Sequence, residues 1–281
     1  MVVHEPGDWF DETLEALAAQ DYPNLRTLFL ITPTEDAAEQ AERIRAVLPE
    51  AFVRELPDNA GFGPSANEVL RLVEGDNGFF LLCHDDIAPA PDAVRALVAE
   101  IYRSNAGIVG PKLTEWDQPR VLQHVGLGLD RYGEVDPVVE PGEVDQEQHD
   151  AVRDVFVLPS ACLLVRADLF RTLGGFDPAI SFHGDDVDLC WRAHLTGARV
   201  IVVPDARVRH RERLTERRPD LNHTVLRARH RMRSVATLTG ASRLLLRSIE
   251  LVVLTLVELV VGLFTGRIGH ALASLRALVG L

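Results

Sequence analysis

Four aspartates and one histidine in the second half of the chain have types and spacing that could support a reaction. Asp177, Asp185, Asp186 and Asp188 lie between two apolar runs of strand length, and His210 ends the second run. Carboxylates in the first turn of a helix often only cap its free amides, an explanation that accounts for one aspartate. Four like charges close together cost free energy unless a cation or a substrate offsets them. The cluster therefore predicts a reaction site, with capping as the structural alternative.

A second acidic group comes earlier in the chain. The apolar run Phe79-Phe80-Leu81-Leu82 leads into Cys83-His84-Asp85-Asp86. Acidic residues at the carboxyl end of a buried strand lie where open α/β sheets bind their ligands. The structural alternative here is a strand-end turn with a capping aspartate. Carboxylate oxygens suit Mg²⁺ or Mn²⁺, so this turn is a candidate cation site.

The elements that must position these groups alternate between strand and helix. Short apolar runs predict strands at residues 1–4, 25–31, 52–56, 79–82, 106–109, 161–165 and before His210. Apolar residues at helical spacing predict helices over 8–20, 37–47, 93–101, 167–173 and 185–197. Such alternation predicts an α/β fold, in which helices cover both faces of a mostly parallel sheet. Residues 115–154, rich in Gly, Pro and acids, predict an ordered excursion with mobile parts and a hairpin element at Gly126-Leu127-Gly128.

Composition limits the class of protein. A chain of 281 residues with 47% apolar content can bury one substantial core. Its three cysteines lie in apolar contexts without metal-ligand spacing, which predicts free thiols in a reducing compartment. The N-terminus has no basic stretch followed by an apolar one, so we expect no secretory signal.

The charge is distributed unevenly. Residues 207–247 contain twelve arginines and three acidic residues, so this segment carries a charge of +9. Because the whole chain carries −13, the rest of it carries −22. A basic segment beside an apolar one predicts contact with an anionic membrane surface. Nucleic acid is the weaker interpretation, since no nucleic-acid-binding motif accompanies the charge.

The apolar segment from residue 243 to residue 264 carries four charges on one helical stripe, Arg243, Arg247, Glu250 and Glu258. A simple membrane span would avoid such charges, so we expect a helix that lies in the interface or packs its stripe against other helices. A helical pair packed on the catalytic domain is the alternative without a membrane. A further apolar helix is predicted over residues 270–279. The chain would thus divide into a catalytic domain, 1–213, and a basic and apolar helical region, 214–281, that associates with a membrane.

Three motifs carry a family resemblance. The stretches GGFD, GDDVDLCWRA and VPDARVRH between residues 174 and 210 resemble the catalytic domain of family 2 glycosyltransferases, which have the GT-A fold. The stretch from Asn59 to Asn67 resembles the family's N.GFG.A.N segment, which lies beside the donor nucleotide. The resemblance is to bacterial rhamnosyl- and galactofuranosyl-type enzymes of the cell envelope. It implies transfer of a sugar from a nucleotide-sugar donor to an acceptor hydroxyl, with inversion at the anomeric carbon.

The resemblance also implies a role for each candidate residue. Asp186 would be the catalytic base, and Asp86 and His210 would hold Mg²⁺ or Mn²⁺ on the donor diphosphate. The residues expected to bind the nucleotide sugar are His4, Glu5, Asn59, Asn67 and Asp85. Those expected on the acceptor side are Asp185 and Trp191. A lipid-linked or cell-envelope glycan is the expected acceptor, at the cytoplasmic face of a membrane.

Two positions depart from the family pattern. His84 replaces the first aspartate of the DxD motif, and residues 31–36 lack the usual carboxylate that contacts the base. These departures leave open a second hypothesis, a catalytically silent GT-A domain that serves as a binding or assembly module of a membrane complex. A sugar nucleotidyltransferase is disfavoured, because residues 4–8 do not form its Gly-rich, basic loop.

Overall fold

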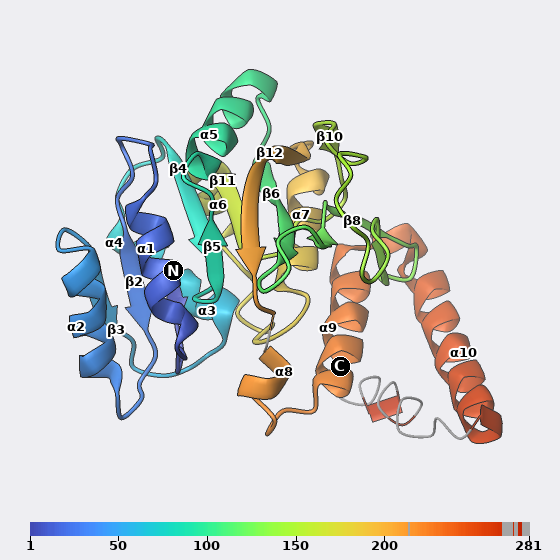
Figure 1. The fold of residues 1–281 in the computed structure, drawn as a ribbon. Helices are drawn as coiled ribbons and strands as arrows, with labels where there is room; N and C mark the ends of the chain where they lie inside the picture. The colour runs from blue at the N-terminus through green and yellow to red at the C-terminus, as the bar shows by residue number, and fades with distance from the viewer. Residues whose placement is uncertain (213, 266–271, 273–274, 277–281) are drawn as a thin grey trace.

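The computed structural model describes residues 1–281 with the exception of 213, 266–271, 273–274 and 277–281. Strands and helices alternate along most of the chain, and helices follow the last strand (Figure 1). The α/β fold that the sequence predicts is therefore confirmed. The helix predicted over residues 270–279 falls largely outside the described residues.

A parallel sheet of three strands opens the chain. β1 (Val2–Val3), β2 (Leu28–Ile31) and β3 (Phe52–Glu55) pair in that order. The helices between them are α1 (Trp9–Ala18) and α2 (Ala37–Val47), and α2 has the predicted bounds. Both helices pack on one face of this sheet through a core that includes Phe10, Leu14, Phe29, Ile31 and Ile44. This packing fixes the carboxyl ends of β1 and β2 side by side.

The central sheet has the strand order β10-β12-β6-β11-β4, with β5 paired to β12 and β7 paired to β6. Strands β6 and β12 run parallel, whereas β11 runs antiparallel to both of its neighbours, β4 and β6. The bounds are β4 (Phe79–Cys83), β5 (Ile87–Pro89), β6 (Ile108–Glu115), β7 (Leu122–His124), β10 (Arg153–Asp154), β11 (Cys162–Arg166) and β12 (Val200–His210).

Helices cover both faces of the central sheet. Along β11, Leu163 and Val165 join a core with α6 (Ala167–Leu173) and α7 (Asp185–Leu195). The alternate residues of β11 join another core with α5 (Ala93–Ser104). This alternation is the period of two expected of a strand buried on both faces. Two short helices, α3 (Phe62–Ala66) and α4 (Val69–Leu72), form the turn-rich approach to β4.

The excursion between β6 and β11 is ordered. β8 (Leu127–Leu129) pairs with β9 (Val135–Pro137), so the predicted hairpin element is confirmed. Lys112 of β6 is fully buried, and its Nζ lies 2.9 Å from Asp145 and also contacts Asp150. These two ion pairs fasten the far end of the excursion to the central sheet.

After β12 the chain forms α8 (Leu214–Arg217), α9 (His223–Leu238) and α10 (Ala241–Thr265). Figure 1 shows α9 beside the end of the central sheet and α10 beyond it at the edge of the molecule. Arg247 and Glu250 of the predicted stripe form an ion pair of 2.5 Å, while the side chain of Glu258 lies outside what the structure describes. Among the described residues, no helix combines the length and the apolar content needed to span a membrane.

Candidate active site

Two strand ends bring carboxylate and imidazole groups together. β4 ends at Cys83, and the turn that begins with His84 leads into β5. β12 ends at His210, which pairs with Ile87 of β5. Because Ile87 directly follows Asp86, this register sets His210 beside Asp86 although the two are far apart in the sequence.

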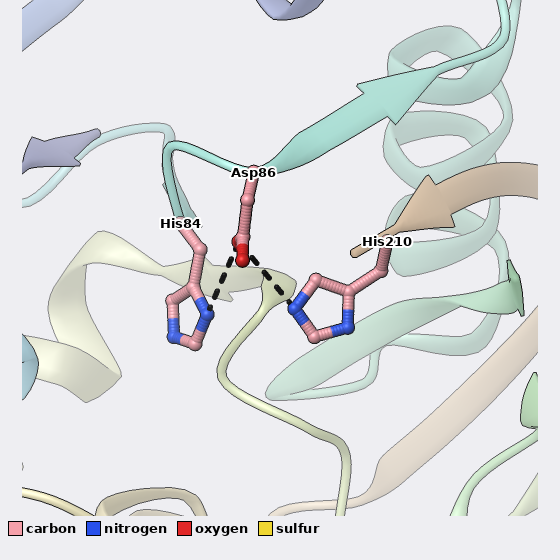
Figure 2. A group of neighbouring side chains, drawn as sticks. All are labelled: His84, Asp86 and His210. Atoms are coloured by element: carbon pink, nitrogen blue, oxygen red, sulfur yellow. Dashed lines mark ion pairs between the residues drawn. The ribbon is translucent and has the colours of Figure 1, made fainter. Parts of the chain in front are cut away.

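His84, Asp86 and His210 form one compact group (Figure 2). Oδ1 of Asp86 lies 3.5 Å from Nε2 of His210 and 3.8 Å from Nδ1 of His84. Oδ1 of Asp86 and Nε2 of His210 are buried, and neither has a hydrogen-bond partner among the described residues. A buried polar atom without a partner costs about 1–3 kcal/mol, a cost that a cation among the three side chains would remove. The group therefore fits a divalent metal ion, and we call it the metal group.

Burial and neighbouring charges set the protonation states of the metal group. Burial lowers the pKa of His84 to about 4, so this imidazole is neutral near pH 7. Nδ1 of His210 lies 2.8 Å from Oε1 of Gln123, so Nδ1 donates and Nε2 faces Asp86. Burial raises the pKa of Asp86, but the neighbouring His210 and the charge of Arg217 outweigh that effect and hold the pKa below its ordinary value. Asp86 is therefore ionised, as a metal ligand must be.

Asp85 connects this turn to the first strand. Its Oδ2 accepts a hydrogen bond of 2.8 Å from the backbone nitrogen of His4. The His4 ring in turn lies 2.8 Å from Oγ1 of Thr32 and 3.2 Å from Nδ2 of Asn59. Arg217 donates two hydrogen bonds to Asp85, of 2.7 and 2.9 Å. Burial raises the pKa of Asp85, although the charge of Arg217 opposes that effect.

The first turn of α7 presents the second pair of acids. Gly184 has φ +88°, a left-handed conformation that favours glycine, and it turns the chain into α7. Asp185 is buried, and its Oδ2 has no hydrogen-bond partner within the described part of the chain. Oδ1 of Asp186 accepts a hydrogen bond of 2.8 Å from the nitrogen of Val187. Burial first, and then the charge of Asp185, raise the pKa of Asp186 to about 7. A carboxylate with such a pKa is suited to accept a proton near neutral pH.

One cavity of about 600 Å³ joins these groups. The predicted site residues that line it are His4, Asn59, Asp85, Asp86, Asp185, Asp186 and His210. The metal group and the acids of α7 therefore face a common space, although nothing in the sequence alone brings them together. Such a concave space with convergent polar groups and shifted pKa values is typical of an active site.

Helix α9 completes the cavity. Nδ1 of His230 lies 2.7 Å from the carbonyl oxygen of Phe182 and 2.8 Å from that of His183, which holds the helix against the loop before α7. Arg227 and Arg231 of the same helix line the cavity. The lining thus continues past residue 213, the boundary that the sequence predicts for the catalytic domain.

Three predicted residues lie outside the lining of this cavity. Asn67 donates to the carbonyl oxygen of Phe176 at 2.9 Å and accepts from its nitrogen at 2.8 Å, so its amide holds the loop after α6. Trp191 packs against Phe156, with ring centroids 6.0 Å apart. Glu5 lines a neighbouring cavity of about 920 Å³ at the ends of β1 and β2, together with residues 33–36.

Sequence reasoning gave no role to three residues of the main cavity. His84 departs from the DxD pattern yet belongs to the metal group, and its spacing of two from Asp86 was the available signal. Nδ1 of His124 is buried in the wall, where burial lowers the pKa of this histidine to about 4. Arg217 carries no local signal, because its partner Asp85 belongs to a strand end far earlier in the chain.

Comparisons with known proteins show the family and the fold to which the chain is similar. Residues 6–237 match a family model described as glycosyltransferase like family 2. The N-acetylglucosaminyl-diphospho-decaprenol L-rhamnosyltransferase of Mycobacterium tuberculosis is 26% identical over 254 residues, which cover 82% of this chain and 80% of that protein. A pre-mycofactocin glycosyltransferase of the same organism is 30% identical over 157 residues, or 54% of this chain, but the match spans only 30% of that relative's length.

Solved structures support the same fold. The mannosyltransferase PcManGT from Pyrobaculum calidifontis, solved with GDP-Man and Mn²⁺, superposes with a TM-score of 0.56 at 15% identity. The superposition covers 99% of this chain and 84% of that one. At this identity the similarity establishes the GT-A fold alone. Because the family model spans most of the chain, including the metal group and the acids of α7, the chain belongs to the family 2-like glycosyltransferases.

Proposed function

We propose that this chain transfers a sugar from a nucleotide-sugar donor to a hydroxyl of a lipid-linked or cell-envelope glycan, with inversion at the anomeric carbon. The observation that carries the proposal is the common cavity, which has the metal group on one wall and Asp186, with a pKa of about 7, on another. A donor diphosphate needs a cation to balance its charge, and an acceptor hydroxyl needs a base to take its proton. A single displacement between them would invert the configuration.

The metal group would hold Mn²⁺ or Mg²⁺ through His84, Asp86 and His210. A divalent ion there would offset the charge that develops on the departing diphosphate. Two imidazoles beside one carboxylate favour a transition metal such as Mn²⁺ over Mg²⁺, which prefers oxygen ligands. The orphaned Oδ1 of Asp86 and Nε2 of His210 support this assignment.

The chain's own residues supply the proton acceptor and the donor contacts. Asp186 would take the proton of the acceptor hydroxyl. Asp185 would bind the acceptor through its Oδ2, which has no hydrogen-bond partner among the described residues. His4, Asn59 and Asp85 would bind the sugar nucleotide from the first-strand side of the cavity. Glu5 would face the base, since the neighbouring cavity lies at the ends of β1 and β2.

The relatives and α10 support a lipid-linked acceptor at a membrane. The mycobacterial relative is named for a diphospho-decaprenol substrate. Large apolar side chains of α10 are exposed, among them Leu245 at 75% and Phe264 at 88%. Exposed apolar surface of this extent, beside a basic segment, fits a helix that lies on the cytoplasmic face of an anionic membrane.

A sedimentation experiment tests the membrane part. The wild-type chain should sediment with anionic vesicles, and Leu245→Glu together with Leu256→Glu should abolish this binding. Phe52→Glu, in β3, is the matched control, because the exposure of Phe52 (60%) lies between those of Leu256 (53%) and Leu245 (75%), and this variant should bind as the wild type does. Equal binding by the α10 variant would refute the assignment of α10 to the membrane.

A binding screen tests the catalytic part. Calorimetric titration of UDP, GDP and their sugars, with and without Mn²⁺, should reveal metal-dependent binding of one nucleotide. Transfer to a lipid-linked acceptor should follow with that donor. A silent assembly module would bind none of these compounds in a metal-dependent way, and this result would favour the second hypothesis.

A further inference from the structure

Arg217 lies inside the cavity although it comes from a four-residue helix after the last strand. Its side chain is only 15% exposed. Two of its nitrogens donate to Asp85, and Nη2 also contacts the carbonyl oxygen of His4. Nη1 lies 3.9 Å from Oδ2 of Asp86, so the guanidinium adjoins the metal group. An arginine that is buried beside the metal group does not serve as an ordinary solvated surface charge.

One nitrogen of this guanidinium has no partner in the part of the chain that the structure describes. Nε of Arg217 is buried and makes no hydrogen bond to any described residue. The guanidinium carbon also lies 5.7 Å from the ring centroid of Trp9, within the range of a cation–π contact. Arg217 therefore keeps an unused donor while it contacts Asp85, His4 and Trp9.

The charge balance of the cavity floor shows what Arg217 changes. A divalent ion on the metal group would neutralise the two carboxylates, Asp85 and Asp86, because both histidines can bind it as neutral ligands. Arg217 then adds one positive charge. Glu212, which also lines the cavity, is faced in turn by the charge of Arg227. With a divalent ion bound, the group formed by Asp85, Asp86, Glu212, Arg217 and Arg227 thus carries one net positive charge, which Arg217 supplies. A positive charge beside a divalent ion suits a polyanion.

We propose that Arg217 is a second binding group for the donor diphosphate, acting beside the metal ion. It waits on Asp85 in the free protein and turns its fork to the phosphate oxygens when the donor binds. Arginine suits this role because its planar fork can hold two phosphate oxygens at once. The inference rests on the proposed function and adds to it a residue from the segment that the sequence assigns to the membrane region.

Two binding measurements distinguish this role from a structural one. In Arg217→Met, the dissociation constant for UDP or GDP with Mn²⁺ should rise about tenfold or more, because a charge-assisted hydrogen bond is lost. The affinity for Mn²⁺ alone should instead increase, by about tenfold at most, because a positive charge near Asp86 is gone. Arg218→Met removes the same charge from the neighbouring residue, which pairs with Asp220, and should leave both constants unchanged.

If Arg217 contacts the diphosphate, Arg217→Met should bind the nucleotide more weakly and Mn²⁺ alone more tightly. Weakening of both would make Arg217 a structural residue, and tighter nucleotide binding would make it a competitor of the donor. Either result overturns the inference. Arg217→Lys guards against misfolding, since it keeps the charge and should show wild-type Mn²⁺ affinity with nucleotide binding weakened severalfold. If the wild type binds no nucleoside diphosphate, the proposed function itself fails, and the inference fails with it.

Discussion

Replacing Asp186 by asparagine should remove the proton acceptor of the reaction and leave the donor side intact. General-base catalysis contributes about 10²- to 10⁴-fold, so kcat should fall by a factor in this range. Asparagine has nearly the same shape, and its amide oxygen can still accept the hydrogen bond from Val187 that Asp186 accepts at 2.8 Å. Metal-dependent nucleotide binding should therefore survive, because the metal group lies at the ends of β4 and β12 and Asp186 lies on α7.

The pKa of Asp186 sets the expected pH dependence. With a pKa of about 7, raised by burial and by Asp185, the ionised base makes up about a tenth of the enzyme at pH 6 and about a hundredth at pH 5. Below pH 7, kcat/KM should thus fall about tenfold per pH unit. The direction follows from the chemistry, since only the ionised carboxylate can take a proton.

A variant of Asp185 tests the cause of this pKa. Asp185→Asn removes the neighbouring negative charge, so the pKa of Asp186 should fall and the acid limb of the profile should move to lower pH. The rate at pH 6, relative to the rate at pH 8, should increase in this variant.

The assay is a pH series of kcat/KM with the donor found in the binding screen. Near-normal turnover of Asp186→Asn would refute the assignment of the base. An acid limb that stays in place in Asp185→Asn would refute the electrostatic explanation, even if Asp186 proved essential.

Three further predictions concern the metal group and the fold. In a thermal-melting experiment, Mn²⁺ at about 100 times its dissociation constant should raise the Tm by roughly 5–10 °C. Mg²⁺ at the same concentration should raise the Tm less, and Asp86→Ala should abolish the shift. Lys112→Met should lower the free energy of unfolding by about 3–5 kcal/mol in urea, since it leaves Asp145 without its buried partner, and an unchanged midpoint would contradict this reasoning. Gly61→Ala should lower the Tm more than Gly142→Ala: both glycines have positive φ, but only at Gly61 would a Cβ meet backbone, 1.9 Å from the oxygen of Ser181.

Helices that depend on local spacing were predicted well from the sequence. α2 and α6 have the predicted bounds, because the apolar period of a helix and its end signals lie within a few residues of one another. β6 was predicted to end at Val109, before Pro111, yet it runs on to Glu115. The neighbouring strand β12 has a register shift between Val203 and Arg207, directly after the residue that pairs with Pro111, and such a bulge tolerates the missing donor of proline.

The sequence by itself determined the α/β alternation, the family and the acidic turns, because each is encoded in neighbouring residues. Asp185 and Asp186 adjoin each other in the chain, as do Asp85 and Asp86. Only the tertiary structure decided which distant groups share a cavity. The pairing of β12 with β5 sets His210 beside Asp86, and Arg217 forms an ion pair with Asp85. Trp191 packs against Phe156, and Asn67 binds the loop after α6. These choices depend on strand register and helix packing over long separations, which local patterns of residues do not encode.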